Sequence, residues 1–486
     1  MSAVTVILVI VIVTALAFDF TNGFHDTANA MATSISTGAL KPFAAVAVSA
    51  AFNVIGALLS VEVATTITAG IVDLQAPALV DSSGSDKLLV LVFAGLVGAI
   101  LWNMFTWLLG LPSSSSHAIF GGIIGAAVGS LGLSGVQWSN IMGKLIVPAV
   151  VSPVIAAIVA ACATALVYWI TNTIPEKQKA THFRHGQVIT ACLVSLAHGA
   201  GDAQKTMGVI FLALIATGHA DATQRIPFIV IIACAAAIAL GTLSGGWRVI
   251  RTLGKGLVDL EPPQGMAAEA TSAAIILTSA AGGMALSTTH VTTGAIIGTG
   301  FGKKGATVRW GVALRMVSAW IITLPCAALV GFLTYEIAKV FWNTSLLVGV
   351  LVDVAILLAT VAYIIVRARR NKVDASNVNA EWIPDTETID SSITGSTEID
   401  EILKRDMEKI LSGSLDSAAA SEIAATQAPS RRQAIAELRE QRESIIAQLR
   451  EIDMRLESEL FAQADEDPTT RTQHRKAPGS TSEHVK

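Results

Sequence analysis

The residues with the clearest chemical potential lie in a polar stretch near the start of the chain, Phe20–Ala32, which reads FTNGFHDTANAMA. It interrupts a long apolar run, so two adjacent ionisable side chains, His25 and Asp26, fall at the depth where lipid is expected. An aspartate near a bilayer centre costs about 2.5–3.5 kcal/mol on insertion scales, and such a residue usually serves binding or transport. We therefore expect the helix to be unwound around a polar site, loosened by Asn22 and Gly23.

The same pattern returns in the second half of the chain as Leu196–Gly208, LAHGAGDAQKTMG. Asp26 corresponds to Asp202 at an offset of 176 residues, and Asn29 corresponds to Lys205. Matching interrupted segments in the two halves of a membrane protein indicate a transporter site. The two carboxylates would repel an anion and attract a cation. We therefore expect them to bind the cation that drives transport, a proton or a sodium ion, together with carbonyl groups freed by unwinding. The alternative is that each carboxylate only holds its unwound helix in place. The predicted coupling-cation residues are Asp26, Asn29, Asp202 and His25.

Two hydroxyl-rich clusters form a second duplicated pair, since Ser114–His117 matches Ser287–His290 at an offset of 173 residues. Each cluster precedes a glycine-rich apolar segment, so its hydroxyl groups and the N–H groups that open the next helix could surround a tetrahedral anion. The alternative is that the clusters only cap helices. The predicted substrate-binding residues are Ser114, Ser115, Ser116, Ser287, Thr288, Thr289, Gln204 and Lys205.

Other polar residues in apolar surroundings are expected to support this site. His117 and His290 end the two clusters, where each would either donate to a carbonyl that holds the tip or bind a ligand directly. Lys205 would attract an anion, pair with Asp202 or extend to the membrane interface. Asn53 lies in the middle of an apolar segment and is expected to bond between helices.

These motifs need a membrane-embedded helical frame to bring them together. Of the 486 residues, 52% are hydrophobic and 14% are charged, against about 25% charged in soluble domains. This composition predicts an all-α polytopic membrane protein. The four cysteines stand singly in apolar runs, which is typical of packing residues. The sequence contains no GxxxxGK[ST] motif, so use of ATP by this chain is not expected.

Hydrophobic segments and helix breakers predict two repeats, each with a broken helix and a re-entrant helical hairpin. The broken crossings are Val4–Leu40 and Val188–Thr217. The hairpins are Leu88–Leu131 and Met266–Gly300, with tips at Ser113–His117 and Ser287–His290. The other predicted spans are Phe43–Val63, Ile141–Ile170, Ile226–Leu243, Trp310–Leu333 and Leu346–Val366. The glycine-rich arms Gly121–Gly129 and Gly294–Gly302 are expected to pack helices closely.

Loop charges predict the orientation of this layout. With the N-terminus outside, lysine and arginine concentrate on the cytoplasmic side, as the positive-inside rule requires. The outer segments then contain chiefly Lys87, Lys144, Arg225 and Lys339. The first half crosses the membrane a net three times. Because this number is odd, the second half starts on the other side and has the inverted orientation, so the two hairpins enter from opposite faces of the membrane. Counting each hairpin arm as a full span would keep the sides but change the architecture.

The predicted divisions are residues 1–171 for the first repeat, 172–187 for a cytoplasmic linker and 188–366 for the second repeat with one extra span. Residues 367–486 form a cytoplasmic tail whose polar composition predicts partial disorder. Within it, residues 433–460 place apolar side chains on an a/d pattern, which fits either a short coiled coil or a surface helix.

Four motifs, NGFHDTANA, HGAGDAQK, LPSSSSH and STTH, resemble those of the Pit family of inorganic phosphate transporters and occur in that family's order. The resemblance covers Val4–Val366 and implies a phosphate symporter driven by protons or sodium. It also implies a functional role for Glu269. The alternative is that the Glu269 carboxylate only stabilises a helix N-terminus near Pro262. Two positions depart from the family's pattern: Gly201, where Asn is usual, and Ala285, where Pro is usual.

The resemblance also bears on the coupling ion. Family members similar to the sodium-coupled type tend to carry Asn at the position of His25, and histidine titrates near neutrality, so His25 favours proton coupling. The sequence therefore predicts a secondary transporter in the plasma membrane that imports inorganic phosphate, alone or as a metal–phosphate complex, by proton symport. Sodium symport, with sodium at Asp26 and Asp202, is one alternative. The other is a membrane scaffold or phosphate sensor that acts through the tail.

No enzyme activity, cofactor or nucleic-acid partner is expected from the sequence. The expected partners are inorganic phosphate, the lipid bilayer and a second copy of the chain, since the a/d pattern of residues 433–460 and the family both favour a homodimer.

Overall fold

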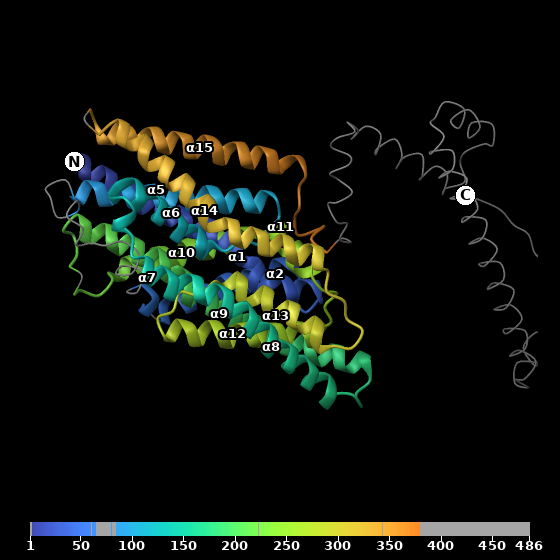
Figure 1. Ribbon diagram of the computed structural model, residues 1–486. Coiled ribbons are helices and arrows are strands. Elements are labelled where there is room, and N and C mark those ends of the chain that lie inside the picture. The colour runs from blue at the N-terminus through green and yellow to red at the C-terminus, as the bar shows by residue number, and fades with distance from the viewer. Residues whose placement is uncertain are drawn as a thin grey trace, which may run out of the picture. The chain divides into compact units, whose positions relative to one another are not determined.

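The computed structural model describes residues 2–59, 61–64, 79, 84–221, 223–342 and 344–379 of the chain (Figure 1). In that part of the chain the regular structure is helical, apart from an isolated β-bridge between Val258 and Val308. The helices that carry the polar motifs are α1 (Ala3–Ser36), α5 (Gly84–Leu108), α6 (Ser115–Leu131), α9 (Glu176–Ala216), α12 (Pro262–Ala281) and α13 (Thr288–Gly302). The others are α2 (Pro42–Leu59), η1 (Leu133–Gly135), α7 (Trp138–Ile141), η2 (Met142–Ile146), α8 (Val147–Ile170), α10 (Phe228–Ser244), α11 (Trp247–Lys255), α14 (Trp310–Val340) and α15 (Leu346–Arg370).

Among the described residues, six helical segments are long and apolar enough to cross a membrane: α1, α2, α5, the continuous stretch Trp138–Ile170, α14 and α15. A seventh candidate is the pair α10 and α11, which is bent by 68°. Large apolar side chains such as Val13, Ile158 and Leu358 are exposed on these helices, where lipid would cover them. The prediction of an all-α, multi-pass membrane protein is confirmed.

The predicted breaks in the two crossings that carry the aspartates are wrong. α1 is one helix of 34 residues and α9 is one helix of 41 residues, and neither is interrupted at its polar motif. The glycines in these motifs have another purpose: a Cβ atom on Gly23 would collide with the carbonyl oxygen of Ile238 on α10. A Cβ atom on Gly199 would likewise collide with the carbonyl oxygen of Asn53 on α2. Glycine therefore allows neighbouring helices to touch, and side chains rather than freed carbonyls build the polar site.

Two pairs of helices, α5 with α6 and α12 with α13, pack against each other as helical hairpins. The first arm of each ends at a glycine with positive φ, 65° at Gly110 and 67° at Gly283, a conformation that favours glycine after a helix. The second arm of each begins after an N-cap serine, Ser114 or Ser287. The two predicted tips are therefore turns of matching geometry.

The second arm of each hairpin packs closely against a helix from the other half of the chain. On α6, Cβ atoms on Gly121 and Gly125 would collide with backbone atoms of α14. On α13, Cβ atoms on Gly294 and Gly298 would collide with backbone atoms of α8. The prediction that these glycine-rich segments pack helices is confirmed.

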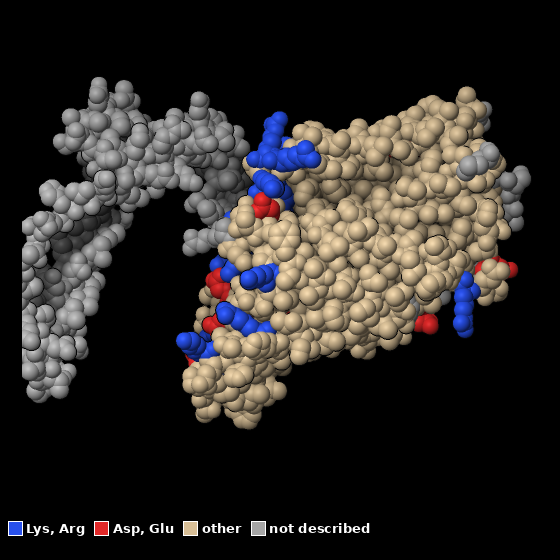
Figure 2. Space-filling view, turned by 180° about the vertical axis from the view of Figure 1, so that it is seen from behind, with Lys and Arg blue, Asp and Glu red and all other residues tan. Residues whose placement is uncertain are grey.

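Basic residues gather at one end of the described bundle, and a broad surface with few charged side chains separates them from the other end (Figure 2). Where α1 ends, Lys255 Nζ donates to the carbonyl of Ser36 at 3.2 Å, and Arg184 Nε donates to the carbonyl of Thr37 at 3.1 Å. These cations satisfy carbonyl groups at the C-terminal end of α1, where a helix favours positive charge.

Contacts within the chain divide it into two units, Met1–Pro384 and Asp385–Lys486. α9 begins at Glu176, so most of the predicted linker, residues 172–187, is helical. The predicted coiled coil at residues 433–460 lies outside the described residues, as does the rest of the tail beyond residue 379.

Candidate functional site

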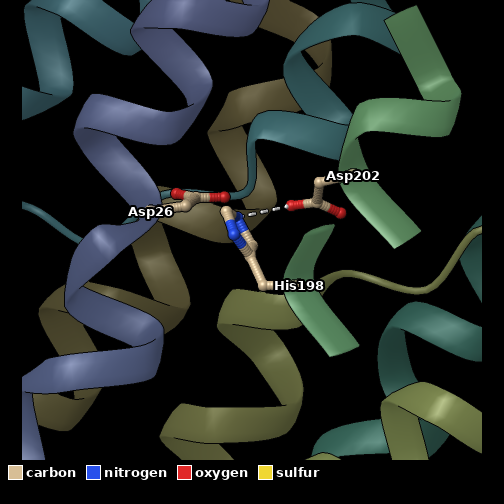
Figure 3. Close-up of side chains that lie close together, drawn as sticks. All are labelled: Asp26, His198 and Asp202. Atoms are coloured by element: carbon tan, nitrogen blue, oxygen red, sulfur yellow. Dashed lines mark ion pairs between the residues drawn. The ribbon is translucent and has the colours of Figure 1, made fainter. Parts of the chain in front are cut away.

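Two aspartates from different halves of the chain meet inside the helical bundle. Asp26 on α1 and Asp202 on α9 lie with His198 so that one ligand atom from each is within 4.8 Å of the other two (Figure 3). All three side chains are at most 2% exposed. His198 Nε2 lies 3.2 Å from Asp202 Oδ2, an ion-pair distance when the imidazole is protonated. Such a group of anionic and imidazole ligands could hold a small cation between the two carboxylates.

The first carboxylate is paired with its neighbour in the sequence. His25 Nδ1 lies 2.6 Å from Asp26 Oδ1. The other ring nitrogen, Nε2, lies 3.4 Å from the hydroxyl oxygens of both Thr106 and Ser113, which are themselves 2.8 Å apart. A row of groups with exchangeable protons therefore extends from Asp26 to the tip of the first hairpin.

The second carboxylate has more partners. Lys205 donates to Asp202 Oδ1 in a short contact, and Thr288 donates to Asp202 Oδ2 at 3.2 Å. Lys205 Nζ also donates to Ser116 Oγ at 2.5 Å and to the Leu286 carbonyl at 3.2 Å. All three ammonium donors are thereby used, one on the tip of the first hairpin and one on the residue just before the tip of the second. The pairing of Lys205 with Asp202 is confirmed, and its extension to the membrane interface is wrong, because the side chain is only 2% exposed.

Each polar motif also binds the hairpin tip of the other half. Asn29 Nδ2 donates to Thr289 Oγ1 at 2.9 Å, as Lys205 donates to Ser116. These contacts are equivalent, because Asn29 corresponds to Lys205 and Ser116 corresponds to Thr289 in the duplicated motifs. The tips also touch each other, since Thr289 Oγ1 donates to the Ser113 carbonyl at 3.1 Å.

The first serine of each cluster caps a helix. Ser114 Oγ accepts from the backbone N–H of His117 at 3.2 Å, and Ser287 Oγ accepts from that of His290 at 3.3 Å. The capping alternative is confirmed for these two residues. Ser115, by contrast, is buried at the N-terminus of α6, and its hydroxyl has no hydrogen-bond partner among the described residues. It is therefore an open donor where the helix dipole favours an anion.

The histidines that end the clusters stack, with ring centroids 4.9 Å apart and an interplanar angle of 18°. His290 Nδ1 donates to the Ala149 carbonyl at 3.1 Å. Pro153, inside α8, has no N–H to bond that carbonyl four residues earlier, so the acceptor is left for the histidine. The prediction that a histidine donates to a carbonyl is confirmed for His290. His117 Nδ1 instead lies 2.6 Å from Ser114 Oγ.

Glu269 on α12 binds α1 and α9 rather than the hairpin tips. Four side chains donate to its carboxylate at 2.5–3.1 Å: Thr33, Ser34, Gln187 and Thr190. The alternative of a helix N-terminal carboxylate is wrong for Glu269, because α12 begins at Pro262 and its N-cap is Glu261. Glu269 therefore connects the second hairpin to both helices that carry the aspartates.

Two positions in the second motif differ from the arrangement expected. Gln204 is not brought to the tips: its Oε1 accepts from the Val63 N–H at 2.7 Å, and its Nε2 donates to the Ala200 carbonyl. Gly201, which departs from the family's asparagine, leaves an open space, since within 4 Å a Cβ atom there would meet among the described residues only Ile276 Cγ2, at 3.9 Å.

Sequence reasoning missed His198, although its position carried a signal. It precedes Asp202 by four residues, one helical turn, and corresponds to Asn22 of the first motif. Asn53 bonds between helices as predicted, because its Nδ2 donates to Thr242 Oγ1 at 2.8 Å and its Oδ1 lies 3.1 Å from His198 Nδ1. An amide oxygen only accepts, so His198 Nδ1 carries a hydrogen. His198 Nε2 then faces the Asp202 carboxylate in one of two ways: it donates an N–H of a protonated imidazole, or it binds the same cation as the carboxylate.

Comparisons with a family profile, with curated proteins and with solved structures all find similarity to phosphate transporters. The profile described as the phosphate transporter family matches residues 22–331. A probable low-affinity inorganic phosphate transporter of Mycobacterium tuberculosis is 56% identical over 377 residues, which cover 77% of this chain and 87% of that one. A protein of the same description from Bacillus subtilis is 40% identical over 342 residues, which cover 70% of this chain and 100% of that one. Among solved structures, a sodium-dependent phosphate transporter shares the fold, with a TM-score of 0.60 at 22% identity over 69% of this chain and 99% of that chain.

Proposed function

This chain belongs to the phosphate transporter family, and on that premise we propose that it imports inorganic phosphate by cation symport, with the proton as the coupling ion. One observation carries the proposal: two hydroxyl-bearing helix N-termini meet two carboxylates and a buried lysine. Donors for an anion and acceptors for a cation therefore lie side by side.

Phosphate would bind at the hairpin tips. The N-termini of α6 and α13 offer positive dipole ends, and Ser115 offers an unpartnered hydroxyl. Ser116, Thr288 and Thr289 now bond to Lys205, Asp202 and backbone groups, so phosphate would replace some of these partners. Lys205 would turn from Asp202 towards the anion and supply the full positive charge at the site.

Coupling would follow from the charge of the two aspartates. Phosphate cannot bind beside two bare carboxylates without strong repulsion. A cation on Asp26 or Asp202 removes part of that repulsion, so anion and cation favour each other's binding. The short His25–Asp26 contact supports a proton in this role. Sodium is the alternative, supported by the proximity of Asp26, His198 and Asp202, and a metal–phosphate complex would offset the same charge.

The transporter would consist of two inverted repeats whose hairpins enter the membrane from opposite faces. The equivalent contacts Asn29–Thr289 and Lys205–Ser116 support this symmetry. The bases of the hairpins also lie at opposite ends of α14. A Cβ atom on Gly129 of α6 would contact Tyr335 near the end of α14, whereas Arg309, just before α14, pairs with Asp259 at 2.9 Å. Movement of the hairpins would then expose the tips to each side in turn.

We assign the basic end of the bundle to the cytoplasm of the plasma membrane. The N-terminus would then be outside, because the C-terminal ends of α1 and α15 meet at α11: Lys255 donates to Ser36, and Arg248 donates to the Ala368 carbonyl at 2.8 Å. A single cysteine in place of Thr5 should react with an impermeant maleimide on intact cells. A cysteine in place of Lys304 should react only after lysis, and the reverse pattern would contradict the assignment.

Radiolabelled phosphate uptake tests the proposed function. Purified full-length protein in proteoliposomes would be given a proton gradient or a sodium gradient separately, with and without magnesium. We expect accumulation driven by the proton gradient, abolished by a protonophore, and lost in Asp26→Asn and Asp202→Asn. Accumulation driven only by sodium would move the assignment to sodium symport. No accumulation by folded protein under either gradient would refute symport.

A further inference from the structure

Besides Asp26, α1 carries a second buried aspartate, Asp19, which has no part in the site described above. Asp19 precedes Asp26 by seven residues, about 10 Å along the helix. The side chain is 0% exposed, and neither carboxylate oxygen has a hydrogen-bond partner among the described residues. A buried, charged carboxylate without a partner is costly, so Asp19 is expected either to hold a proton or to face a cation.

The groups near Asp19 do not neutralise it. Thr206 on α9 lies beside it, and Asp202 and Lys205 are the charged residues whose fields reach it. The Lys205 ammonium is nonetheless occupied by Asp202, Ser116 and the Leu286 carbonyl. The hydroxyl of Thr206 is also fully buried and has no partner in the described part of the chain.

Two buried asparagines, one on α1 and one on α5, add further unpartnered atoms. Asn22 Oδ1 and both amide atoms of Asn103 are buried without hydrogen-bond partners among the residues that the structure describes. Asn22 lies one turn from Asp19 on α1, three residues before His25. Asn103 lies three residues before Thr106 on α5, and Thr106 Oγ1 is 3.4 Å from His25 Nε2.

α1 and α5 run in the same direction, because both end against α11. There Lys255 donates to the carbonyl of Ser36, and Arg248 donates to that of Leu108 at 3.3 Å. One turn back from the contact between His25 and Thr106, the two helices therefore bring their asparagines to the same level.

We propose that Asp19, Asn22, Asn103 and Thr206 form a second binding site for the coupling cation. Carboxylate, amide and hydroxyl oxygens are the ligands that small hard cations prefer. The site lies between Asp26 and the N-terminal end of α1, so a cation that enters from that end would occupy it next to the Asp26 site. This inference rests on the proposed cation symport. The ligand is a monovalent cation, and separate proton and sodium gradients identify it.

The test is the number of cations moved with each phosphate. The assay uses proteoliposomes with the membrane potential clamped at zero. At equilibrium, the ratio of internal to external phosphate then equals the ratio of external to internal cation raised to an exponent. That exponent is the number of cations moved with each phosphate. Asp19→Asn keeps the size of the side chain and removes the charge. We expect it to retain transport with the exponent lowered by one. The matched control is Asp353→Asn, another buried aspartate, on α15, which should keep the wild-type exponent.

An unchanged exponent in Asp19→Asn would overturn the proposal, as would an equal fall in Asp353→Asn. Failure of symport itself would look different, because the wild type would then not accumulate phosphate under either gradient. That result would overturn both proposals. Should Asp19→Asn fail to fold, Asn103→Leu removes one amide and leaves the carboxylate. It should raise the half-saturating concentration of the driving cation about tenfold. A wild-type value in that variant would also overturn the site.

Discussion

Replacing Lys205 by methionine separates the structural role of this buried lysine from its proposed role in phosphate binding. Methionine keeps the apolar stem and removes the ammonium that now binds Asp202, Ser116 and the Leu286 carbonyl. Removing one partner of a buried ion pair destabilises a protein by about 3–5 kcal/mol, because the other charge stays buried alone. The variant should therefore unfold at a lower temperature, as measured by the intrinsic tryptophan fluorescence of the purified protein.

The effect on phosphate should be separable from this loss of stability. A hydrogen bond from a charged donor contributes about 1.5–3 kcal/mol. Its loss should raise the half-saturating phosphate concentration about 10–100-fold, since about 1.4 kcal/mol is a factor of ten. In the double variant Lys205→Met with Asp202→Asn both charges are gone, so stability should recover substantially over the single variant. The half-saturating phosphate concentration in a binding assay should remain raised.

Lys339→Met is the control for removal of a lysine, because its ion pair with Glu336 is exposed and should contribute at most about 1 kcal/mol. Wild-type phosphate affinity in Lys205→Met would refute the binding role. A double variant no more stable than Lys205→Met would refute the argument that an uncompensated Asp202 charge causes the loss of stability.

Three further predictions concern packing, coupling and pH. Gly23→Val should prevent the close contact of α1 with α10 and sharply reduce the yield of folded protein, whereas Gly311→Val, with open space around it, should be tolerated in the same size-exclusion assay. His25→Asn should abolish phosphate accumulation driven by a proton gradient while leaving the protein folded, and proton-driven uptake at the wild-type rate would contradict the proposed role of His25 in proton coupling. Burial would raise the pKa of the Glu261 carboxyl, but the hydrogen bonds that it accepts from Lys303 and Tyr168, together with its ion pair with Lys303, outweigh this and hold the pKa below its ordinary value. The stabilisation from this pair is therefore present near neutral pH and lost as the pH falls through that lowered pKa. In Lys303→Met, the free energy of unfolding should decrease less on acidification than in the wild type, as measured by thermal unfolding at several pH values. The difference should be under about 1 kcal/mol, because Glu261 is partly exposed.

Much of the frame could be predicted from the sequence, because lipid imposes a simple length and polarity rule on each crossing. The predicted extra span Leu346–Val366 lies within α15, and the hairpin tips fall where serine follows a helix stop. The duplicated motifs also identified the two aspartates that meet in the structure, since equal spacing in two halves predicts a shared site.

Other features depend on contacts that a sequence does not display. The sequence predicts that α1 unwinds at Gly23, but this glycine serves close packing, and only the position of Ile238 on another helix distinguishes the two uses. Gln204 lies within the motif yet turns to Val63, because one turn of a helix can present neighbouring residues to different partners. The role of Pro153 in leaving the Ala149 carbonyl to His290 likewise needs the neighbouring hairpin.

The close packing of α6 against α14 has a consequence for how the protein is made. The glycine face of α6 is synthesised well before its partner helix, which begins only at Trp310. At about 5–20 residues per second, translation leaves α6 without that partner for roughly 10–40 s. During that interval lipid, other helices or insertion factors must cover the glycine face. Neither half can complete its own packing, so the two halves should assemble only when both are present in the same membrane, even if they are translated as separate chains.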